Sequence, residues 1–165
     1  MPKEDTIFDG TKIKYSGNFD YKEIYKKLYT WITQQGYSKP YEEKYWEKVK
    51  PDGKLVEFVW NTENIKEDYF KFKITIQFTF DGLKEAEAEY KGKKIKLDNG
   101  RTEIKFSAKL ERNFNRKWKN ENGLMFQLYE KYIIPDKIEE AKIDLYQDTN
   151  KLIEETKNYF NLFKF

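Results

Sequence analysis

The sequence of 165 residues contains no cysteine and no histidine. The lack of cysteine excludes disulfides, thiolate nucleophiles and cysteine metal sites, and the lack of histidine removes the side chain that most often acts as a general base or metal ligand. The glycine-rich phosphate loops, the G-x-S-x-G nucleophile motif and the EF-hand loop are also missing. We therefore predict no cofactor and no metal. An enzyme would depend on carboxylates, lysines or tyrosines, and the sequence singles out none of them.

Long hydrophobic runs are missing as well. No apolar run approaches the roughly 18 residues that predict a membrane-spanning helix, and the first ten residues, MPKEDTIFDG, lack the hydrophobic segment of a signal peptide. The 8 Gly and 4 Pro form no linker that would divide the chain. We expect an intracellular, cytoplasmic protein that does not insert into a membrane and that forms a single domain over residues 1–165.

Aromatic and charged residues are abundant. The chain holds 13 Phe, 13 Tyr and 4 Trp, and because each ring buries a large area, these positions can build a core although the hydrophobic class is only 38%. Charged residues make up 37%, with 32 Lys and Arg interleaved with 29 Asp and Glu. The net charge of +3 does not by itself imply a polyanionic partner.

The clearest pattern is the alternation in DYFKFKITIQFTFDG, residues 68–82, where every even position from 70 to 80 is apolar. Such alternation is typical of a strand with one buried face. The segment 101–114 repeats it, with Arg112 as the single break. Two strands with the same one-sided pattern belong to one sheet. Their apolar side chains line either a filled core or a cavity: Phe70, Phe72, Ile74, Ile76, Phe78, Phe106, Ala108 and Leu110.

Turn residues mark the ends of the other strands. The tripeptide Pro51-Asp52-Gly53 predicts a tight turn that joins two antiparallel neighbours, and Asp81-Gly82 predicts a second turn after the alternating segment. A short segment near the N-terminus alternates more weakly. The predicted strands are 7–15, 41–50, 54–61, 69–80, 83–90 and 101–114.

The predicted strand 83–90 has two different faces. Ala86 and Ala88 share one face with Tyr90, and two small residues would let a helix approach that face closely. The other face holds three glutamates, Glu85, Glu87 and Glu89, which could bind a hard cation or pair with lysines of neighbouring strands. We favour the pairing, because both flanking strands offer lysines at matching spacing: Lys71, Lys73, Lys105 and Lys109.

One helix is predicted before most of the strands, over residues 21–35. Asp20 and Glu23 have the spacing of a capping box in front of it. Its apolar residues recur at helical spacing on one face, and they are Ile24, Leu28, Trp31 and Ile32.

Two more helices are predicted after the strands. The first covers 122–134 and ends before Pro135. Asp136 and Glu139 predict a capping box for the second, over 137–160. At about 1.5 Å per residue this last helix spans roughly 36 Å, close to the roughly 40 Å of the strand 69–80. We therefore expect it to cover the apolar faces of the alternating strands.

This order of elements resembles that of helix-grip proteins, the START-like and pathogenesis-related class. The resemblance covers most of the chain but rests on no sequence motif: the glycine-rich loop of the plant members is absent, and the helix 122–134 is additional. It predicts an α+β fold with a single antiparallel meander sheet of five or six strands, packed on one face by an N-terminal helix and a long C-terminal helix. Helix-grip proteins enclose an apolar ligand between sheet and helix, so the resemblance implies a cavity. A filled sandwich is the alternative.

The segment ERNFNRKWKN, residues 111–120, is the densest cluster of basic and aromatic residues. In one interpretation its cations hold phosphates while its rings stack on unpaired bases. In the other it is a strand end and a loop, whose rings anchor to the core and whose charges face the acidic final helix. We favour the second interpretation. The candidate contacts to an anion or to nucleic acid are Arg112, Arg116, Lys117, Trp118 and Lys119.

Two further sets of aromatic residues suit a protein interface, because large rigid rings are enriched there. We therefore predict a non-catalytic interaction or assembly module that self-associates or binds another protein. The alternatives are a helix-grip binder of an apolar small molecule and a single-stranded nucleic-acid-binding protein. The candidate interface residues are Tyr21, Tyr25 and Tyr29 on the first predicted helix, and Phe160, Phe163 and Phe165 in the C-terminal tail.

Overall fold

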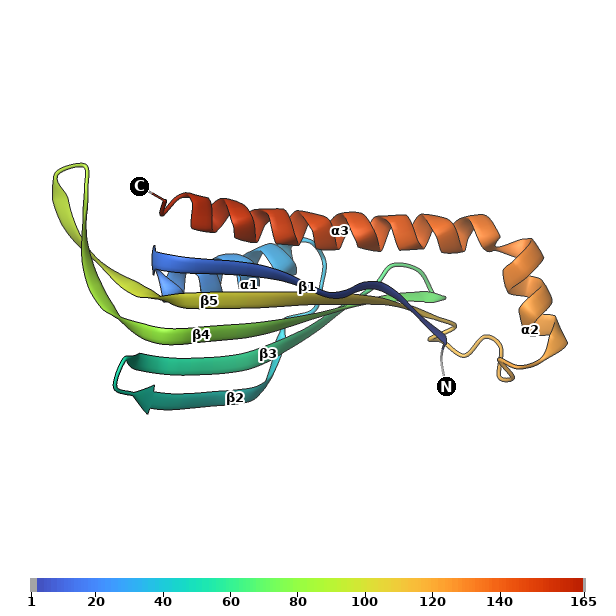
Figure 1. Ribbon diagram of the computed structural model, residues 1–165. Coiled ribbons are helices and arrows are strands. Elements are labelled where there is room, and N and C mark those ends of the chain that lie inside the picture. Colours follow the sequence, from blue (N-terminus) through green and yellow to red (C-terminus); the bar gives the residue numbers. More distant parts are fainter. Residues whose placement is uncertain (1–2, 165) are drawn as a thin grey trace.

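Five antiparallel strands form one sheet in the computed structural model, which describes residues 3–164 (Figure 1). The strand order is β1–β5–β4–β3–β2, so that β1 returns beside the last strand. The predicted α+β fold with one antiparallel sheet is confirmed. The elements are β1 Lys3–Phe19, α1 Tyr21–Gln34, β2 Tyr41–Lys50, β3 Gly53–Ile65, β4 Phe70–Tyr90, β5 Lys93–Arg112, α2 Leu124–Leu128, the π-helical turn η1 Tyr129–Ile133 and α3 Pro135–Asn161.

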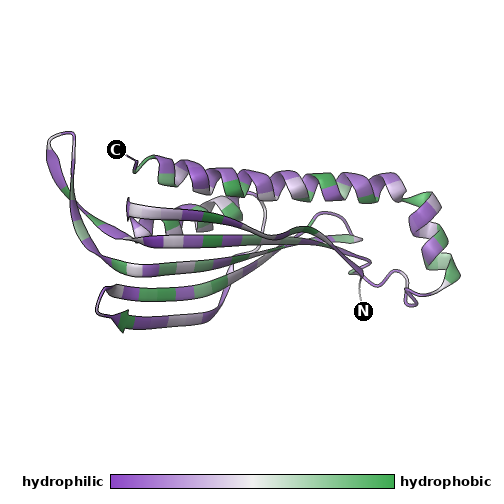
Figure 2. Ribbon diagram, viewed as in Figure 1, coloured by the Kyte–Doolittle hydropathy of each residue, from purple (hydrophilic) through white to green (hydrophobic). Residues whose placement is uncertain are grey.

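α1 and α3 lie over the same face of the sheet, called the inner face (Figure 1). The even-numbered residues of β4 from Phe70 to Phe80 are at most 3% exposed there, and those of β5 from Ile104 to Leu110 at most 1%. Figure 2 shows the resulting bands of hydrophobic and hydrophilic residues along both strands. The opposite, outer face carries the odd-numbered polar residues. The expectation that both alternating segments lie beneath the terminal helix is confirmed, and the arrangement is helix-grip-like.

α3 follows the inner face over its whole length and buries one side of its surface. Its residues Leu145, Leu152 and Tyr159 are fully buried, and full burial of one such side chain stabilises the fold by about 1.5–3 kcal/mol. The Tyr159 hydroxyl also donates to the Asp20 carbonyl (2.8 Å) and accepts from the Asp20 amide (3.1 Å). The end of α3 is thereby joined to the start of α1.

α1 begins where its sequence predicts, with one of the two contacts of the predicted capping box; the Asp20 amide donates to Tyr159 and not to the Glu23 side chain. Asp20 has an extended backbone, and its side chain accepts a hydrogen bond from the Glu23 amide at 3.1 Å. This contact satisfies one of the amides that a helix start leaves without an intrahelical partner. Ile24, Leu28 and Ile32 are at most 1% exposed, so the predicted apolar side of the helix faces the sheet.

The predicted turn at Asp81-Gly82 is wrong. β4 continues through it to Tyr90, and the chain reverses at Lys91-Gly92, whose positive φ angles of 51° and 76° are typical of a type I′ hairpin. Gly82, with φ 66°, lies in a bulge where two residues of β4 face one of β5. The dipeptide bends the strand instead of ending it, because pairing with β5 continues on both sides.

Beyond the bulge, β4 and β5 pair in the sheet only with each other and project as a two-stranded arm, residues 84–97 (Figure 1). The extra residue of β4 in the bulge exchanges the two faces of the strand, so that residues beyond it point to the opposite side of the sheet from residues of the same parity before it. Glu85 lies opposite Asp98, and Asp98 lies opposite the buried Phe19, so the odd residues of β4 are now on the inner side. The two alanines of the arm therefore lie on the outer side, and the helix contact predicted for them is wrong.

Two of the three glutamates of the arm face lysines across it. Glu87 lies opposite Lys96 and Glu89 opposite Lys94. Because β4 does not fold back at residue 82, the neighbouring lysines are those of the arm itself and not the predicted Lys71, Lys73, Lys105 and Lys109.

Further boundaries differ from the predictions. β5 begins at Lys93 and not at 101, and β3 continues to Ile65. β1 runs over 17 residues and follows β5 through two bulges, where only a short strand was expected. The helix predicted over 122–134 begins at Leu124 and changes from α to π geometry at Tyr129. α3 begins at Pro135, so that Asp136 lies within the first turn and the predicted second capping box does not form.

Candidate functional site

The end of the molecule opposite the arm consists of the loop 113–123 followed by α2 and η1, together called the end cap (Figure 1). The loop closes on Asn113, which is fully buried and has φ 59°. Asn113 Oδ1 accepts from the Trp118 amide (3.0 Å), and Nδ2 donates to the Trp118 carbonyl (2.7 Å). Asparagine tolerates this left-handed conformation, and its amide side chain holds the loop in a tight reversal.

One side of α2 and η1 packs on the sheet. Phe126 is 1% exposed, and the Tyr129 ring lies 5.2 Å from the Trp118 ring and 5.9 Å from the Tyr69 ring, measured between centroids. Ile134, at the corner before α3, is 6% exposed. These contacts hold the end cap on the body of the protein.

An ion-pair cluster beneath η1 explains the single break in the apolar pattern of β5. The Arg112 Nε lies 2.7 Å from Asp5 Oδ2 of β1, and its guanidinium also pairs with Glu130 of η1. The Tyr69 hydroxyl donates to the same Glu130 at 2.7 Å. Burial of the Tyr69 hydroxyl, and to a smaller extent this hydrogen bond, raises the pKa of Tyr69 well above its usual range. Arg112 thus connects β1, β5 and the end cap.

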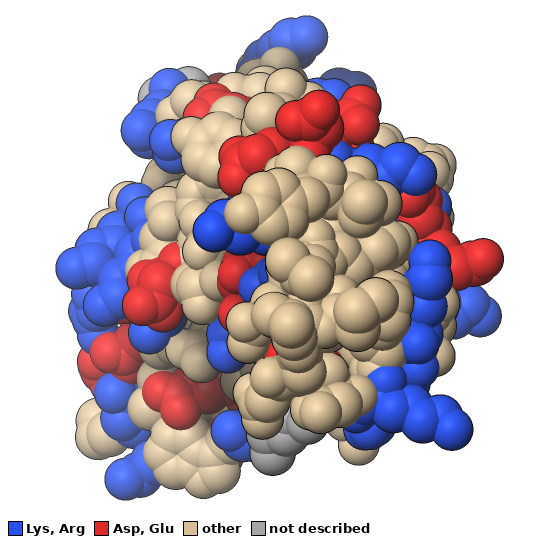
Figure 3. Space-filling view, turned by 90° about the vertical axis from the view of Figure 1, so that its right-hand side faces the viewer, with Lys and Arg blue, Asp and Glu red and all other residues tan. Residues whose placement is uncertain are grey.

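The outward side of α2 and η1 is apolar. A helix with large apolar residues on two sides is usually covered on both, yet here only one side is covered. Figure 3 shows this end of the molecule, with a broad area of uncharged residues bordered by charges of both signs. The exposed large residues, called the end patch, are Leu124, Met125, Leu128, Tyr132 and Ile133, with exposed fractions of 69%, 65%, 40%, 65% and 69%.

The sequence contained a signal for the end patch that we did not use. Leu124, Leu128 and Tyr132 recur every fourth residue, while Phe126 is buried on the opposite side of the same short helix and Ile134 is buried at the corner that follows it. One ten-residue helix cannot bury both sides against one sheet end, so an apolar residue on each side indicates a surface for a second contact.

The predicted basic segment is divided between two places. Arg112 belongs to the ion-pair cluster, whereas Arg116, Lys117 and Lys119 lie exposed in the loop beside the end patch. Trp118 is half-buried against Tyr129. The three loop cations form no ion pair with any acid of the described residues 3–164, including those of α3.

The three predicted interface tyrosines of α1 are half-buried against the core. The ring of Tyr21 lies 4.9 Å from that of Phe80, and the ring of Tyr25 lies 4.9 Å from that of Trp60. Tyr29 contacts the same tryptophan at 6.1 Å. Burial, and then the hydrogen bond that the Tyr25 hydroxyl donates to Glu42, raise the pKa of Tyr25 to about 12.

The predicted aromatic tail also packs on the protein itself. Phe160 is 2% exposed and stacks on Tyr15 of β1 at 4.6 Å, and Phe163 is half-buried beside Tyr159 at 5.2 Å. Phe165 lies outside the described residues. As a result, Phe160 contributes to the fold, and Phe163 lies at the margin of the core.

The predicted cavity residues of β4 and β5 are packed against other rings and against the helices. Phe78 lies 4.6 Å from Phe58 and 4.8 Å from Trp60 between ring centroids. A hollow of about 130 Å³ reaches this set at Phe70 and Phe72, near the start of α3. All of the set are at most 3% exposed: Phe70, Phe72, Ile74, Ile76, Phe78, Phe106, Ala108 and Leu110.

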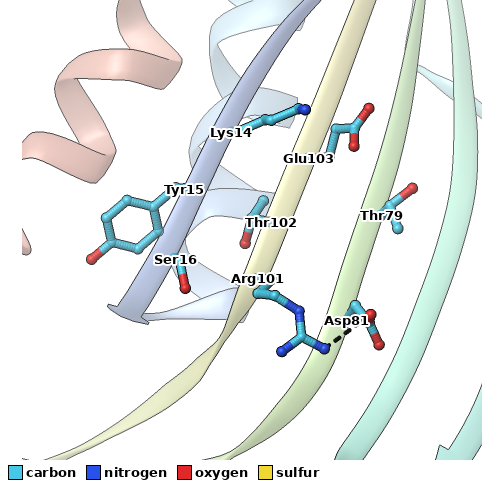
Figure 4. A pocket seen from close by; sticks show the side chains of 8 residues that line it. All are labelled: Lys14, Tyr15, Ser16, Thr79, Asp81, Arg101, Thr102 and Glu103. Atoms are coloured by element: carbon cyan, nitrogen blue, oxygen red, sulfur yellow. Dashed lines mark hydrogen bonds and ion pairs between the residues drawn. The ribbon is translucent and has the colours of Figure 1, made fainter.

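A larger, shallow hollow of about 520 Å³ lies where β1, β5 and β4 run side by side (Figure 4). Its charged groups neutralise one another. Arg101 pairs with Asp81 at 3.0 Å, and Lys50 reaches the same carboxylate at 2.7 Å. The hydrogen bond from Lys50, and to a smaller extent the one from Arg101, lowers the pKa of Asp81. A lowered pKa makes the Asp81 carboxyl a poor general acid and a weaker base at neutral pH.

Within residues 3–164 no group of three or more acidic side chains could hold a metal ion, and no helix is long and apolar enough to cross a membrane. No protein-family model, curated protein or solved structure matches this chain.

Proposed function

We propose that this protein is a non-catalytic interaction module that binds another protein through the end patch. The observation that carries the proposal is the exposure of five large apolar side chains on one short helix. Isolated apolar residues on a surface are ordinary, but a contiguous group with a charged border marks a binding site. The end patch has the arrangement of a protein interface, with an apolar centre and a rim of both charge signs (Figure 3).

The chemistry of the tyrosines supports a non-catalytic role. Burial, together with contacts to neighbouring acids, raises the pKa of Tyr37, Tyr69 and Tyr159. These phenols stay protonated near neutral pH and supply no general base. In a chain without histidine and cysteine, acid–base or nucleophilic chemistry would then depend on carboxylates and lysines.

The proposal places the interface on the end patch and not on the aromatic residues predicted first. Tyr21, Tyr25 and Tyr29 have ring contacts within the fold, and Phe160 is buried. A binding partner could reach these residues only at their edges. The end patch, in contrast, requires no rearrangement of the protein to become a contact surface.

The alternative predictions have less support. An apolar ligand between sheet and helix would need room among rings that lie about 5 Å from one another. Nucleic-acid binding through the basic segment would lack Arg112, whose guanidinium is occupied by two carboxylates. Both remain predictions from the sequence, and the end patch belongs to neither.

Site-specific photo-crosslinking tests the proposal. A photoreactive residue at position 133 is expected to give one or a few discrete protein adducts in extracts of the source cells. The same residue at position 49, where Val49 is 76% exposed on β2, serves as the matched control. Leu128→Asp should abolish the adducts from position 133, because an unpaired carboxylate in the apolar centre is costly to desolvate. Equal labelling from both positions, or adducts that survive Leu128→Asp, would contradict the proposal.

A further inference from the structure

The free charges of the end cap are all of one sign. Four charged side chains of residues 113–134 are exposed, and all are basic: Arg116, Lys117, Lys119 and Lys131. The two acids of this segment are already engaged. Glu121 is half-buried and accepts a hydrogen bond from Asn113 (3.3 Å), and Glu130 is held by Arg112. Within the end cap itself a partner therefore meets an excess of exposed cations, while the wider border of the end patch holds charges of both signs (Figure 3).

The lysine ammonium groups lie beside the apolar residues and not at a distance from them. Lys117 Nζ is 4.7 Å from the centroid of the Tyr129 ring, and Lys131 Nζ is 5.5 Å from that of Tyr132. On the packed side, Lys3 Nζ lies 5.6 Å from the centroid of the Phe126 ring. Lys131 therefore borders the end patch directly, while Lys117 lies over Tyr129 on the packed side of η1. A molecule that covers the end patch is within reach of Lys131, and one that extends over the edge of η1 also reaches Lys117.

A second copy of the same chain fits this surface poorly. Two end patches placed face to face would bring together two sets of four exposed cations, and like charges across an interface oppose association. The contact would also be small. Residues 124–133 span about 15 Å, and a helix is about 10 Å wide, whereas a stable interface buries roughly 800 Å² on each partner.

The shape of the end patch favours a helical partner. Leu124, Leu128 and Tyr132 form a row at intervals of four residues, which is the ridge that packs into the groove of another helix. Anchors at this spacing are typical of helix recognition. A partner helix with apolar residues toward this ridge and acidic residues on its flanks would match both the row and the cations.

We propose that the partner of the end patch is an acidic amphipathic helix of another protein, which packs along α2 and η1 with its carboxylates beside Lys117 and Lys131. This inference rests on the proposed function, since it names the partner class of the same surface. The apolar row supplies most of the affinity, and the cations select against neutral and basic helices.

A displayed library of random peptides of about 16 residues provides the probe. Peptides are selected on the wild-type protein and counter-selected on Leu128→Asp. Enriched sequences should carry apolar residues at spacings of three and four together with an excess of acids. Binding of a selected peptide should weaken about tenfold in Lys117→Glu/Lys131→Glu, and it should also weaken as salt rises from about 0.05 M to about 0.3 M.

The matched control is Lys44→Glu/Lys48→Glu, which makes the same change in net charge at two exposed positions of β2. It should leave the dissociation constant within about twofold. Circular dichroism of both double variants establishes that they are folded. Lys117→Gln/Lys131→Gln, which removes the cations without adding acids, should give an intermediate loss.

Other outcomes overturn the inference in distinguishable ways. Enrichment of apolar peptides without excess acid, lost in Leu128→Asp but not in the charge reversal, would leave the proposed function standing and remove the acidic partner. Concentration-dependent dimerisation in light scattering, abolished by Leu128→Asp, would make a second copy the occupant. Sedimentation with phosphatidylserine vesicles that is lost on charge reversal would make a lipid surface the occupant. If no peptide is enriched and crosslinking also fails, both proposals fall.

Discussion

The two ends of the sheet extend the same alternating strands but finish them in opposite ways. At one end β4 and β5 project as the arm, whose residues 84–97 pair in the sheet only with each other. At the other end the loop, α2 and η1 fold back and are held by ring contacts and by the Arg112 cluster. The arm is structurally the less supported region, yet the better supported end cap exposes more apolar surface.

This contrast distinguishes a solvated extension from a docking surface. The outer side of the arm holds two alanines opposite Ile95 and the buried Leu97, and among the residues of the arm, all of which are described, Tyr90 is the only large apolar one that is exposed. On its inner side, Glu87 and Glu89 of β4 face Lys96 and Lys94 of β5. The end cap instead presents five large apolar side chains on a rigid support. Apolar exposure there does not follow from poor packing, and this is why we assign the interaction to the end cap.

Breaking the support of the end cap should have the largest effect. Arg112→Ala leaves Asp5 and Glu130 without their cation in a site where the three side chains are 16%, 24% and 10% exposed. We expect a loss of about 3 kcal/mol in the free energy of unfolding, measured by urea denaturation. The matched change near the base of the arm is Arg101→Ala, whose side chain is 60% exposed beside Asp81, and it should leave stability nearly unchanged. Equal effects of both changes would remove the contrast between the two ends.

A smaller effect is expected from the phenol beneath the end cap. Tyr69→Phe removes the hydrogen bond to Glu130, and we expect a loss of about 1 kcal/mol at pH 8. Because the folded state raises the pKa of Tyr69, its contribution is complete below the unfolded pKa of about 10 and declines as pH rises further, by about 1.4 kcal/mol per unit. The difference between wild type and Tyr69→Phe should therefore disappear near pH 11. A difference that stays constant from pH 8 to pH 11 would contradict this account.

Shortening the arm should have the smallest effect. Ala86 and Leu97 are direct partners, so deleting residues 87–90 and 93–96 lets Lys91-Gly92 join them as a two-residue hairpin loop. Since a two-stranded ribbon contributes little by itself, the free energy of unfolding should change by less than about 1 kcal/mol. Crosslinking from position 133 should be unaffected. Loss of folding would mean that the arm supports the sheet, and loss of crosslinking would mean that it shares the binding surface.

Features that depend on local periodicity were predictable from the sequence. The alternation over 70–80 and 104–110 predicted one sheet with one buried face, and Asp20 with Glu23 predicted where α1 begins. These signals act over short range, because a strand has a period of two and a capping contact joins residues three positions apart. The same spacing at Asp136 and Glu139 formed no capping box, because α3 begins at Pro135.

Features that depend on a competition between distant segments were not predictable. Asp81-Gly82 has the composition of a turn, and only its pairing with residues 99–101 converts it to a bulge and inverts the faces of the arm. Arg112 interrupts the apolar pattern of β5, and its counter-charge comes from Asp5, 107 positions away in the sequence. The pattern of β5 alone could not indicate this partner. The end patch belonged to a predicted helix, but which side of that helix would stay uncovered was decided by the position of the sheet end.

By itself, the order of residues determined that β4 and β5 share one apolar face and that two helices are available to cover it. Side-chain alternation places the apolar residues of each strand on a single face, and exposure of that face to water is unfavourable. The tertiary structure alone decided where the strands bend, which charges meet in the interior and which apolar side chains remain outside. Each of these features depends on contacts between segments that are far apart in the sequence. Burial follows the geometry of the whole sheet, and residues 124–133 lie beyond its end.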